Sequence, residues 1–316
     1  MITVALHPQA QTLCDLVNAM GGASASDDQL QEARDGLALL TAGGAGAPQP
    51  IAYLEDRSVP GLQGDIPVRI YRPSSDDGLP ILVWLHGGGW TIGSVDVHDP
   101  ITRAIANAAA CIVVSVDYRL APEHPFPAGL DDCWAALTWV AEHAGEFGGD
   151  PARIAVGGDS AGGNLSAVCA LLARDAGGPR LAMQLLVYPA TDAASDTESY
   201  RTNGEGYLLE LKQMRWFYDC YTRNGGDAND WRISPLRVES VEGVAPALVI
   251  TAEYDPLRDE GEAYARRLSD AGVPVTLTRY DGMIHAFYGL GETFDDAKRA
   301  LDETAEALQR AFGTLR

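Results

Sequence analysis

The feature that most constrains the fold is a regular alternation, from about residue 65 onward, of short apolar segments with segments of helical periodicity. The strand candidates are residues 68–72, 81–85, 111–117, 153–159, 181–188, 247–253 and 275–280. Helical patterns fall near residues 98–109, 129–144, 161–175, 258–271 and 292–312. Apolar strands separated by helices form mostly parallel sheets that are covered on both faces. We therefore expect an α/β protein with helices on both sides of a mostly parallel sheet.

Two stretches do not follow this alternation. Residues 1–50 are helix-like and end in the flexible segment TAGGAGAPQP, and residues 191–235 carry an aromatic cluster of Tyr207, Trp216, Phe217, Tyr218, Tyr221 and Trp231. An insertion between two strands emerges at one edge of the sheet, where it can cover a site built on strand ends. We expect residues 1–50 and 191–235 to form a cap over a main domain of residues 51–190 and 236–316. Packing of the aromatic residues as an ordinary helix core is equally consistent with their spacing.

The charge and the cysteines exclude several classes of function. There are 44 acidic and 23 basic side chains, which give a formal charge of −21 spread along the chain. Such a surface repels nucleic acid and anionic lipid, so we expect neither as a partner. The five cysteines are widely separated and include no CxxC pair, and no apolar run approaches a membrane span. We expect a soluble protein of a reducing compartment.

A candidate nucleophile follows the strand at residues 153–159. The segment from Gly158 to Gly162 reads G-D-S-A-G and leads into a helix-forming stretch. It fits the pattern G-x-S-x-G, in which two glycines permit a sharp turn that presents the serine hydroxyl. An ordinary glycine-rich turn is the alternative, because the five-residue pattern alone is weak evidence. The helix that follows directs its N-terminal N–H groups toward charge developing near Ser160.

A serine hydroxyl needs a base, and that base needs a group to orient it. His285 lies just past the strand at residues 275–280, and Asp255 lies just past the strand at residues 247–253. The order Ser160, Asp255, His285 is the order that α/β-hydrolases use. Glu253 and Asp259 are rivals for the acid; the first is placed inside the strand and the second at the start of the next helix, so Asp255 is favoured.

Other histidines have milder interpretations. His98 and His124 are placed in loops, where hydrogen bonding to the backbone is the expected role. Asp96, His98 and Asp99 superficially resemble metal ligands, but their spacing matches no known metal site. We expect no metal.

The glycine loop HGGGW at residues 86–90 admits two explanations, a phosphate cradle or an oxyanion-binding loop. No lysine follows the glycines, and they lead to Trp90 and a loop instead of a helix, unlike phosphate-binding motifs. A triad hydrolase needs two or more N–H donors near the developing oxyanion, and the residue after the nucleophile supplies only one. The second explanation is therefore favoured.

Together these motifs resemble the hormone-sensitive-lipase-like (bacterial family IV) carboxylesterases of the α/β-hydrolase fold. The resemblance rests on HGGGW at 86–90, GDSAGG at 158–163, DPLRD at 255–259, His285 and YRLAPEHPFPA at 118–128, and it extends from about residue 65 to the end. It implies a mostly parallel sheet of about eight strands, flanked by helices and covered by a helical cap. It also implies an enzyme without a cofactor, cytoplasmic, acting on small-molecule esters of short to medium acyl chains, with a homodimer as one assembly to test.

The resemblance also implies roles for individual residues. Ser160 is the nucleophile, His285 the base and then the acid, and Asp255 the residue that orients His285. The oxyanion donors are the backbone N–H groups of Gly88, Gly89 and Ala161. Trp90, Tyr188 and Phe287 are candidates for apolar pocket walls, though each could be plain core. Alternatives are an amide, formamide or acetyl-ester hydrolase on the same fold, and a ligand-binding protein that has lost the chemistry.

Overall fold

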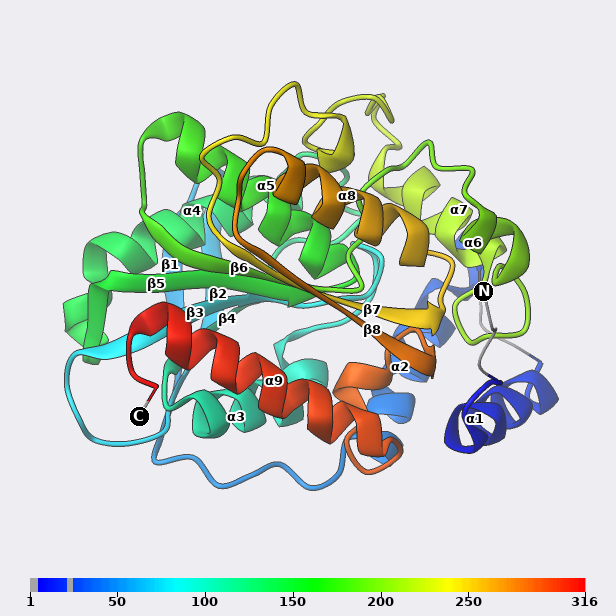
Figure 1. The fold of residues 1–316 in the computed structure, drawn as a ribbon, viewed down its shortest axis with the longest axis horizontal. Helices are drawn as coiled ribbons and strands as arrows, with labels where there is room; N and C mark the ends of the chain where they lie inside the picture. Colours follow the sequence, from blue (N-terminus) through cyan, green and yellow to red (C-terminus); the bar gives the residue numbers. More distant parts are fainter. Residues whose placement is uncertain (1–4, 22–24, 316) are drawn as a thin grey trace.

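The computed structural model describes residues 5–21 and 25–315, and its centre is an eight-stranded sheet between two layers of helices (Figure 1). The strand order is β1-β2-β4-β3-β5-β6-β7-β8. The strands are β1 (Tyr53–Gly61), β2 (Gly64–Arg72), β3 (Leu79–Leu85), β4 (Ile112–Val116), β5 (Gly149–Asp159), β6 (Leu181–Val187), β7 (Ala247–Tyr254) and β8 (Val275–Ile284). The pairs β1/β2 and β2/β4 are antiparallel, and β4, β3, β5, β6, β7 and β8 pair in parallel. The expected α/β architecture with a mostly parallel sheet is confirmed.

Helices cover both faces of the sheet. Helices α3 (Val95–Ala109) and α9 (Asp295–Phe312) pack on one face, and α4 (Ala128–His143), α5 (Ala161–Ala176) and α8 (Arg258–Asp270) pack on the other (Figure 1). The central strands β3 and β4 are buried almost throughout, so each face contributes apolar side chains to its own core. Burial on both faces explains why these strands read as continuous apolar runs.

The sequence pattern does not predict strand β1. Strand β1 lies at the edge of the sheet, and within it only Val59 is buried. Its sequence contains the three consecutive charged residues Glu55, Asp56 and Arg57, so it lacks the apolar signal of the buried strands. Helix α3 begins at Val95, before the predicted start, and His98 therefore lies in its first turn and not in a loop. Pro100, inside this helix, obscures the start in the sequence.

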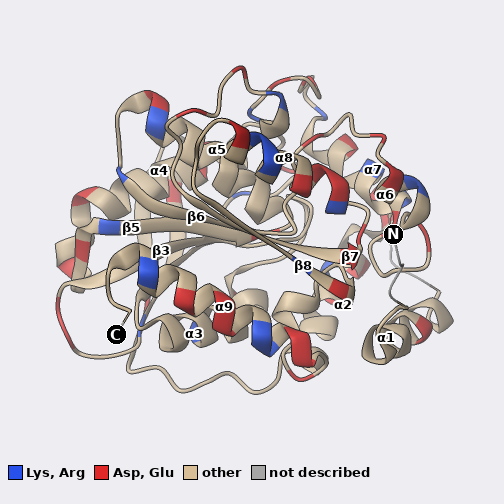
Figure 2. Cartoon of the chain, viewed as in Figure 1, with Lys and Arg blue, Asp and Glu red and all other residues tan. Residues whose placement is uncertain are grey.

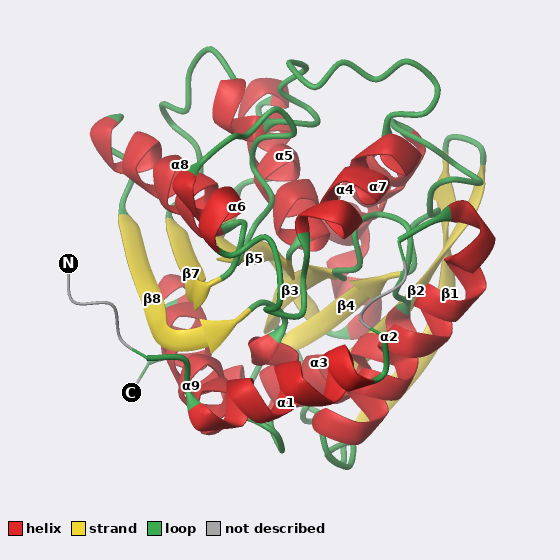
Figure 3. Ribbon diagram, turned by 90° about the vertical axis from the view of Figure 1, so that its right-hand side faces the viewer, coloured by secondary structure: helices red, strands yellow, loops and turns green. Residues whose placement is uncertain are grey.

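The carboxyl ends of the parallel strands meet at one end of the sheet, which Figure 3 views directly. The insertion after β6 contains α6 (Glu198–Thr202), α7 (Leu211–Tyr221) and the short 3-10 helix η3 (Pro235–Arg237). The N-terminal segment contains α1 (Pro8–Ala19), η1 (Asp27–Gln29) and α2 (Leu30–Gly44). Asp27 Oδ1 accepts a hydrogen bond of 3.0 Å from Trp216 Nε1, so η1 contacts α7. By contrast, α1 lies near β8, since the His7 amide donates to the Gly282 carbonyl at 3.0 Å.

Acidic residues occur on helices both above and below the sheet in the view of Figure 2. Among residues 5–21 and 25–315, no helix combines the length and the apolarity that crossing a bilayer requires. The short 3-10 helices η2 (Ala144–Phe147) and η4 (Phe287–Gly289) complete the described elements.

Candidate active site

Ser160 occupies a sharp turn between β5 and α5. Its φ of 55° and ψ of −116° are unusual for a residue with a Cβ, and strain of this kind is typical of nucleophile turns. The turn has no space for other side chains, because a Cβ would lie 2.2 Å from the Leu85 carbonyl oxygen at Gly158 and 1.9 Å from it at Gly162. The Ser160 amide donates to the Val187 carbonyl at 2.8 Å, which holds the turn against β6.

The imidazole of His285 lies between Ser160 and Asp255. Nε2 is 3.0 Å from Ser160 Oγ, and Nδ1 is 2.7 Å from Asp255 Oδ2. A carboxylate only accepts, so Nδ1 carries the proton and Nε2 is left to accept from the serine hydroxyl. Strands β7 and β8 pair Tyr254 with Ile284, which places the next residue of each strand, Asp255 and His285, side by side.

The surroundings of Asp255 fix its carboxylate. The side chain is fully buried, and Oδ1 accepts from the Leu257 amide at 2.8 Å. Asn203, at the end of α6, donates to the Asp255 carbonyl at 3.3 Å. The rival acids are engaged elsewhere: Glu253 accepts from the Gly282 amide at 2.7 Å, and Asp259 accepts from the Ser199 amide at 2.8 Å.

The glycine loop follows β3, and each of its glycines is confined. Gly88 has φ 119° and Gly89 has φ 58°. A Cβ would lie 2.2 Å from Asp159 Oδ2 at Gly87, 2.1 Å from the Ile92 carbonyl oxygen at Gly88, and 2.2 Å from the ring of Phe217 at Gly89. Within the described part of the chain, the amides of Gly88, Gly89 and Ala161 have no hydrogen-bond acceptor. Unpaired amides of this kind are available to an oxyanion.

The three predicted pocket walls are all buried but differ in position. The ring of Tyr188 lies against that of His285, with centroids 4.5 Å apart, and Phe287 packs behind Tyr188 at 6.0 Å. Trp90 stacks on Tyr221 of α7 at 4.5 Å. Tyr188 thus contacts the triad directly, Trp90 joins the glycine loop to the insertion, and Phe287 lies a layer deeper.

Sequence reasoning missed the side chains that hold the glycine loop. Asp159 Oδ1 accepts from the Gly87 amide at 2.9 Å, and His98 Nε2 lies 3.4 Å from the same oxygen. Burial alone would raise the pKa of Asp159, but the charge and the hydrogen bond of His98, together with the hydrogen bond from the Gly87 amide, lower it overall. Phe217 was noted only as one of an aromatic cluster. The position of Asp159 beside the serine in the motif was the only available signal.

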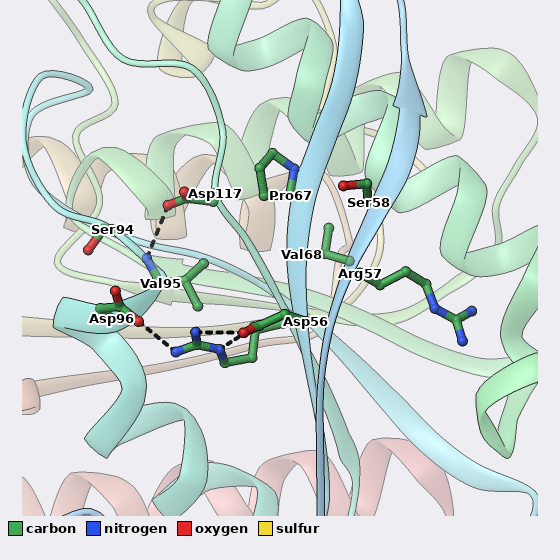
Figure 4. Close-up of a pocket in the computed structure, with 10 residues that line it drawn as sticks. Asp56, Arg57, Ser58, Pro67, Val68, Ser94, Val95, Asp96 and Asp117 are labelled. Carbon is green, nitrogen blue, oxygen red and sulfur yellow. Dashed lines mark hydrogen bonds and ion pairs between the residues drawn. The ribbon is translucent and has the colours of Figure 1, made fainter.

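Other candidates lie away from Ser160. The aspartates beside His98 are engaged by arginines, Asp96 by Arg69 at 2.7 Å and Asp99 by Arg103 at 2.7 Å. Among the residues that the structure describes, no group of three or more His, Cys, Asp or Glu is arranged to hold a metal ion. A polar hollow of about 290 Å³ lies between β1, β2 and the start of α3, where Asp117 accepts from the Val95 amide (Figure 4). None of the predicted site residues lines it.

Comparisons with known proteins agree with this geometry. A family model described as alpha/beta hydrolase fold matches residues 82–289. The carboxylesterase NlhH of Mycobacterium tuberculosis is 48% identical over 270 residues, covering 83% of this chain and 84% of that protein. The carboxylic ester hydrolase LipN of the same species is 47% identical over 268 residues, covering 83% and 71%.

Solved structures give the same result. The ester-hydrolase EH1AB1 from the Lake Arreo metagenome, complexed with a derivative of bipyridine phosphonate, has a TM-score of 0.93 at 42% identity and covers 98% of this chain and 100% of that chain. A thermostable esterase from Pseudomonas putida has a TM-score of 0.93 at 37% identity, with 99% of each chain covered.

Proposed function

The chain belongs to the α/β-hydrolase fold family as a carboxylic ester hydrolase of the hormone-sensitive-lipase-like group, and we propose that Ser160, His285 and Asp255 carry out its chemistry. Ser160 Oγ attacks the ester carbonyl carbon while His285 Nε2 takes its proton. The tetrahedral intermediate collapses, and the leaving alcohol receives that proton from His285. Water then attacks the acyl-enzyme and gives a proton to His285. When the second tetrahedral intermediate collapses, His285 returns that proton to Ser160 Oγ and the acid is released.

The observation that carries this proposal is the continuous hydrogen-bonded chain from Ser160 Oγ through His285 to Asp255, at 3.0 Å and 2.7 Å. Asp255 keeps the imidazole in the tautomer that accepts from serine and stabilises the imidazolium that forms. The unpaired amides of Gly88, Gly89 and Ala161 receive the negative charge of the intermediate. The N-terminus of α5 adds its positive dipole end at the same place.

For the substrate, we propose esters with short to medium acyl chains. Ser160 and His285 are only 8% and 7% exposed, so access to them is narrow. Phe217 covers Gly89 and Tyr188 covers His285, and both rings limit the room beside the reacting carbonyl. A relative named an ethyl acetate hydrolase, from Pseudomonas putida, is 42% identical over 251 residues, covering 78% of each chain, which supports a small acyl group.

The test compares Ser160→Ala with Ser115→Ala on p-nitrophenyl esters of two to ten carbons. Ser115 is a matched control because it is fully buried in β4 and its hydroxyl has no partner among the described residues. We expect Ser160→Ala to lose almost all turnover and phosphonate labelling, while Ser115→Ala keeps both. Turnover near the wild-type level in folded Ser160→Ala would remove the serine mechanism. A p-nitroanilide series run alongside would reveal an amidase, and wild-type protein without turnover or labelling would indicate a binding protein.

Three finer points belong to the proposal. We propose that residues 1–50 and 191–235 form a cap over a domain of residues 51–190 and 236–316, which the contact of Asp27 with Trp216 supports. A cytoplasmic location is supported by five cysteines that are free and buried. A homodimer is supported by the position of β8 at the sheet edge, where β7 is the one described strand that pairs with it, and analytical ultracentrifugation tests it.

A further inference from the structure

The side chains of Asp159 and His86 contact the peptide groups on the two sides of Gly87. The Gly87 amide donates to Asp159 Oδ1 at 2.9 Å, and its carbonyl lies 2.8 Å from His86 Nδ1. Burial lowers the pKa of His86 to about 3, so its ring is neutral, and Nδ1 must carry the proton because a carbonyl only accepts. Tyr118 completes the clamp by donating to the His86 carbonyl at 2.7 Å and stacking on its ring at 4.3 Å.

The carboxylate of Asp159 also acts sterically. It lies so close to the Cα of Gly87 that a Cβ there would come within 2.2 Å of Oδ2. The Asp159 carboxylate thus meets Gly87 at two points, its amide and its Cα, next to the peptide that leads to Gly88. Since the N–H groups of Gly88 and Gly89 follow directly, the orientation of this carboxylate sets the direction of the proposed oxyanion donors.

His98 fixes that orientation. Its Nε2 lies 3.4 Å from Asp159 Oδ1, and its Nδ1 lies 3.3 Å from the Ser94 carbonyl oxygen. Both neighbours are acceptors, and a neutral imidazole has a single N–H, so a neutral ring can donate to one of them and a doubly protonated ring to both. The His98 side chain is 12% exposed and its ring lies 5.3 Å from the neutral ring of His86. When it carries both protons, the ring has a charge opposite to that of Asp159, and this attraction opposes rotation of the carboxylate away from Gly87.

We propose that His98 is a positioning residue for ester hydrolysis, acting through Asp159 and Gly87 to hold the donors of Gly88 and Gly89 in place. This inference rests on the proposed oxyanion role of Gly88 and Gly89. Catalysis would then depend on His98, a residue of α3 outside the triad, in addition to the triad itself. The same role explains why a part-buried histidine lies beside the Asp159 carboxylate, next to Ser160.

The test measures kcat and KM of His98→Leu and His98→Gln on p-nitrophenyl acetate. We expect His98→Leu to lower kcat about 10- to 100-fold with KM within about threefold of wild type, because misaligned donors weaken transition-state binding alone. His98→Gln, which keeps an N–H for Asp159, should recover most of the loss. His143→Leu is a matched control: His143 Nδ1 also lies 2.9 Å from the carbonyl oxygen four residues before it, that of Trp139, but no carboxylate of residues 5–21 or 25–315 forms an ion pair with it.

Measuring His98→Leu again in an Asp159→Asn background separates the proposed effect from a folding defect caused by the loss of His98. An asparagine keeps an oxygen for the Gly87 amide but carries no charge to be neutralised, so His98→Leu should cost less than threefold in that background. An equal loss in both backgrounds, a kcat of His98→Leu within twofold of wild type, or a rise in KM alone would overturn the inference. Phosphonate labelling of Ser160 in each variant shows that the serine chemistry itself is intact, which separates failure of this inference from failure of the proposed function.

Discussion

The contact between Gly89 and Phe217 allows a prediction with an internal control. A Cβ at Gly89 would lie 2.2 Å, 2.4 Å and 2.5 Å from Cγ, Cδ2 and Cδ1 of Phe217. Carbon atoms in contact sit about 3.5–4 Å apart, so the ring or the loop must shift by more than about 1 Å in Gly89→Ala. Phe217 is 4% exposed and packs against Trp216 at 5.2 Å, which leaves it no free direction.

We expect the strain to appear as lost transition-state stabilisation. Overpacking of this kind costs about 1–3 kcal/mol, and the left-handed φ adds about 1 kcal/mol for a residue with a Cβ. If most of that misaligns the amides, kcat of Gly89→Ala on p-nitrophenyl acetate falls about 10- to 100-fold while KM changes little. Gly88→Ala should be at least as severe, since its Cβ would meet the Ile92 backbone at 2.1 Å.

The control lies in how Phe217 is changed. Phe217→Ala removes all three clashing atoms, so Gly89→Ala/Phe217→Ala should return to within about threefold of Phe217→Ala. Phe217→Leu keeps a branched Cγ with two δ carbons and should not rescue. Circular dichroism must show that each variant folds, because Phe→Ala in a core costs about 3–5 kcal/mol. Equal rescue by alanine and leucine, or additive losses, would refute this reasoning.

Asp255, Glu260 and the five buried cysteines allow three further tests. Asp255→Asn places an amide N–H opposite His285 Nδ1 and favours the tautomer that is protonated on Nε2, which cannot accept the serine proton. We therefore expect kcat to fall about 10³- to 10⁴-fold. A loss below tenfold would exclude the orienting role of Asp255. Burial raises the pKa of Glu260 from 4.5 to about 8, so the native state keeps a proton that the unfolded chain releases, and the stability from this group falls as pH rises through that window. A glutamine at this position cannot ionise. Glu260→Gln should therefore have a free energy of unfolding about 2–5 kcal/mol above that of the wild type at pH 9, but no such gain at pH 4, as measured by urea denaturation. If the unfolding free energies of the variant and the wild type change equally with pH, this prediction is wrong. All five cysteines are buried, and burial raises the pKa of each thiol. At pH 8, a disulfide reagent that reacts with free thiols should therefore leave the native enzyme active and unmodified, and should label the cysteines only after urea unfolds the protein.

The sequence predicted the sheet well where burial produces a signal. Strands β3 and β4 are buried throughout or nearly so, and their apolar runs stand out. Strand β1 does not stand out because an edge strand needs few apolar residues, and Val59 alone is buried in it. The place of Asp255 and His285 also follows from sequence, because residues just past parallel strands meet at one edge.

The contacts that hold the glycine loop do not follow from sequence. Phe217 reaches Gly89 through the fold of the insertion after β6, and its register on α7 decides which ring faces the loop. His98 reaches Asp159 because α3 starts a turn earlier than Pro100 suggests. Contacts between residues that are distant in the sequence and lie on irregular segments leave no periodic pattern in the sequence. The structure is therefore needed to identify Phe217 and His98 as neighbours of the glycine loop.

The three glycines are held by different parts of the protein, and this difference has a consequence for catalysis. Gly88 is confined by the Ile92 backbone within its own loop, Gly87 by the Asp159 carboxylate, and Gly89 by the Phe217 ring of the insertion. The residues that confine Gly87 and Gly88, Asp159 at the end of β5 and Ile92 in the loop after β3, lie outside the insertion. Only the third depends on α7, so a displacement of α7 that admits a substrate would release Gly89 alone. In the proposed mechanism, Gly87 and Gly88 are therefore held by residues outside the insertion, and Gly89 is held by Phe217 of α7.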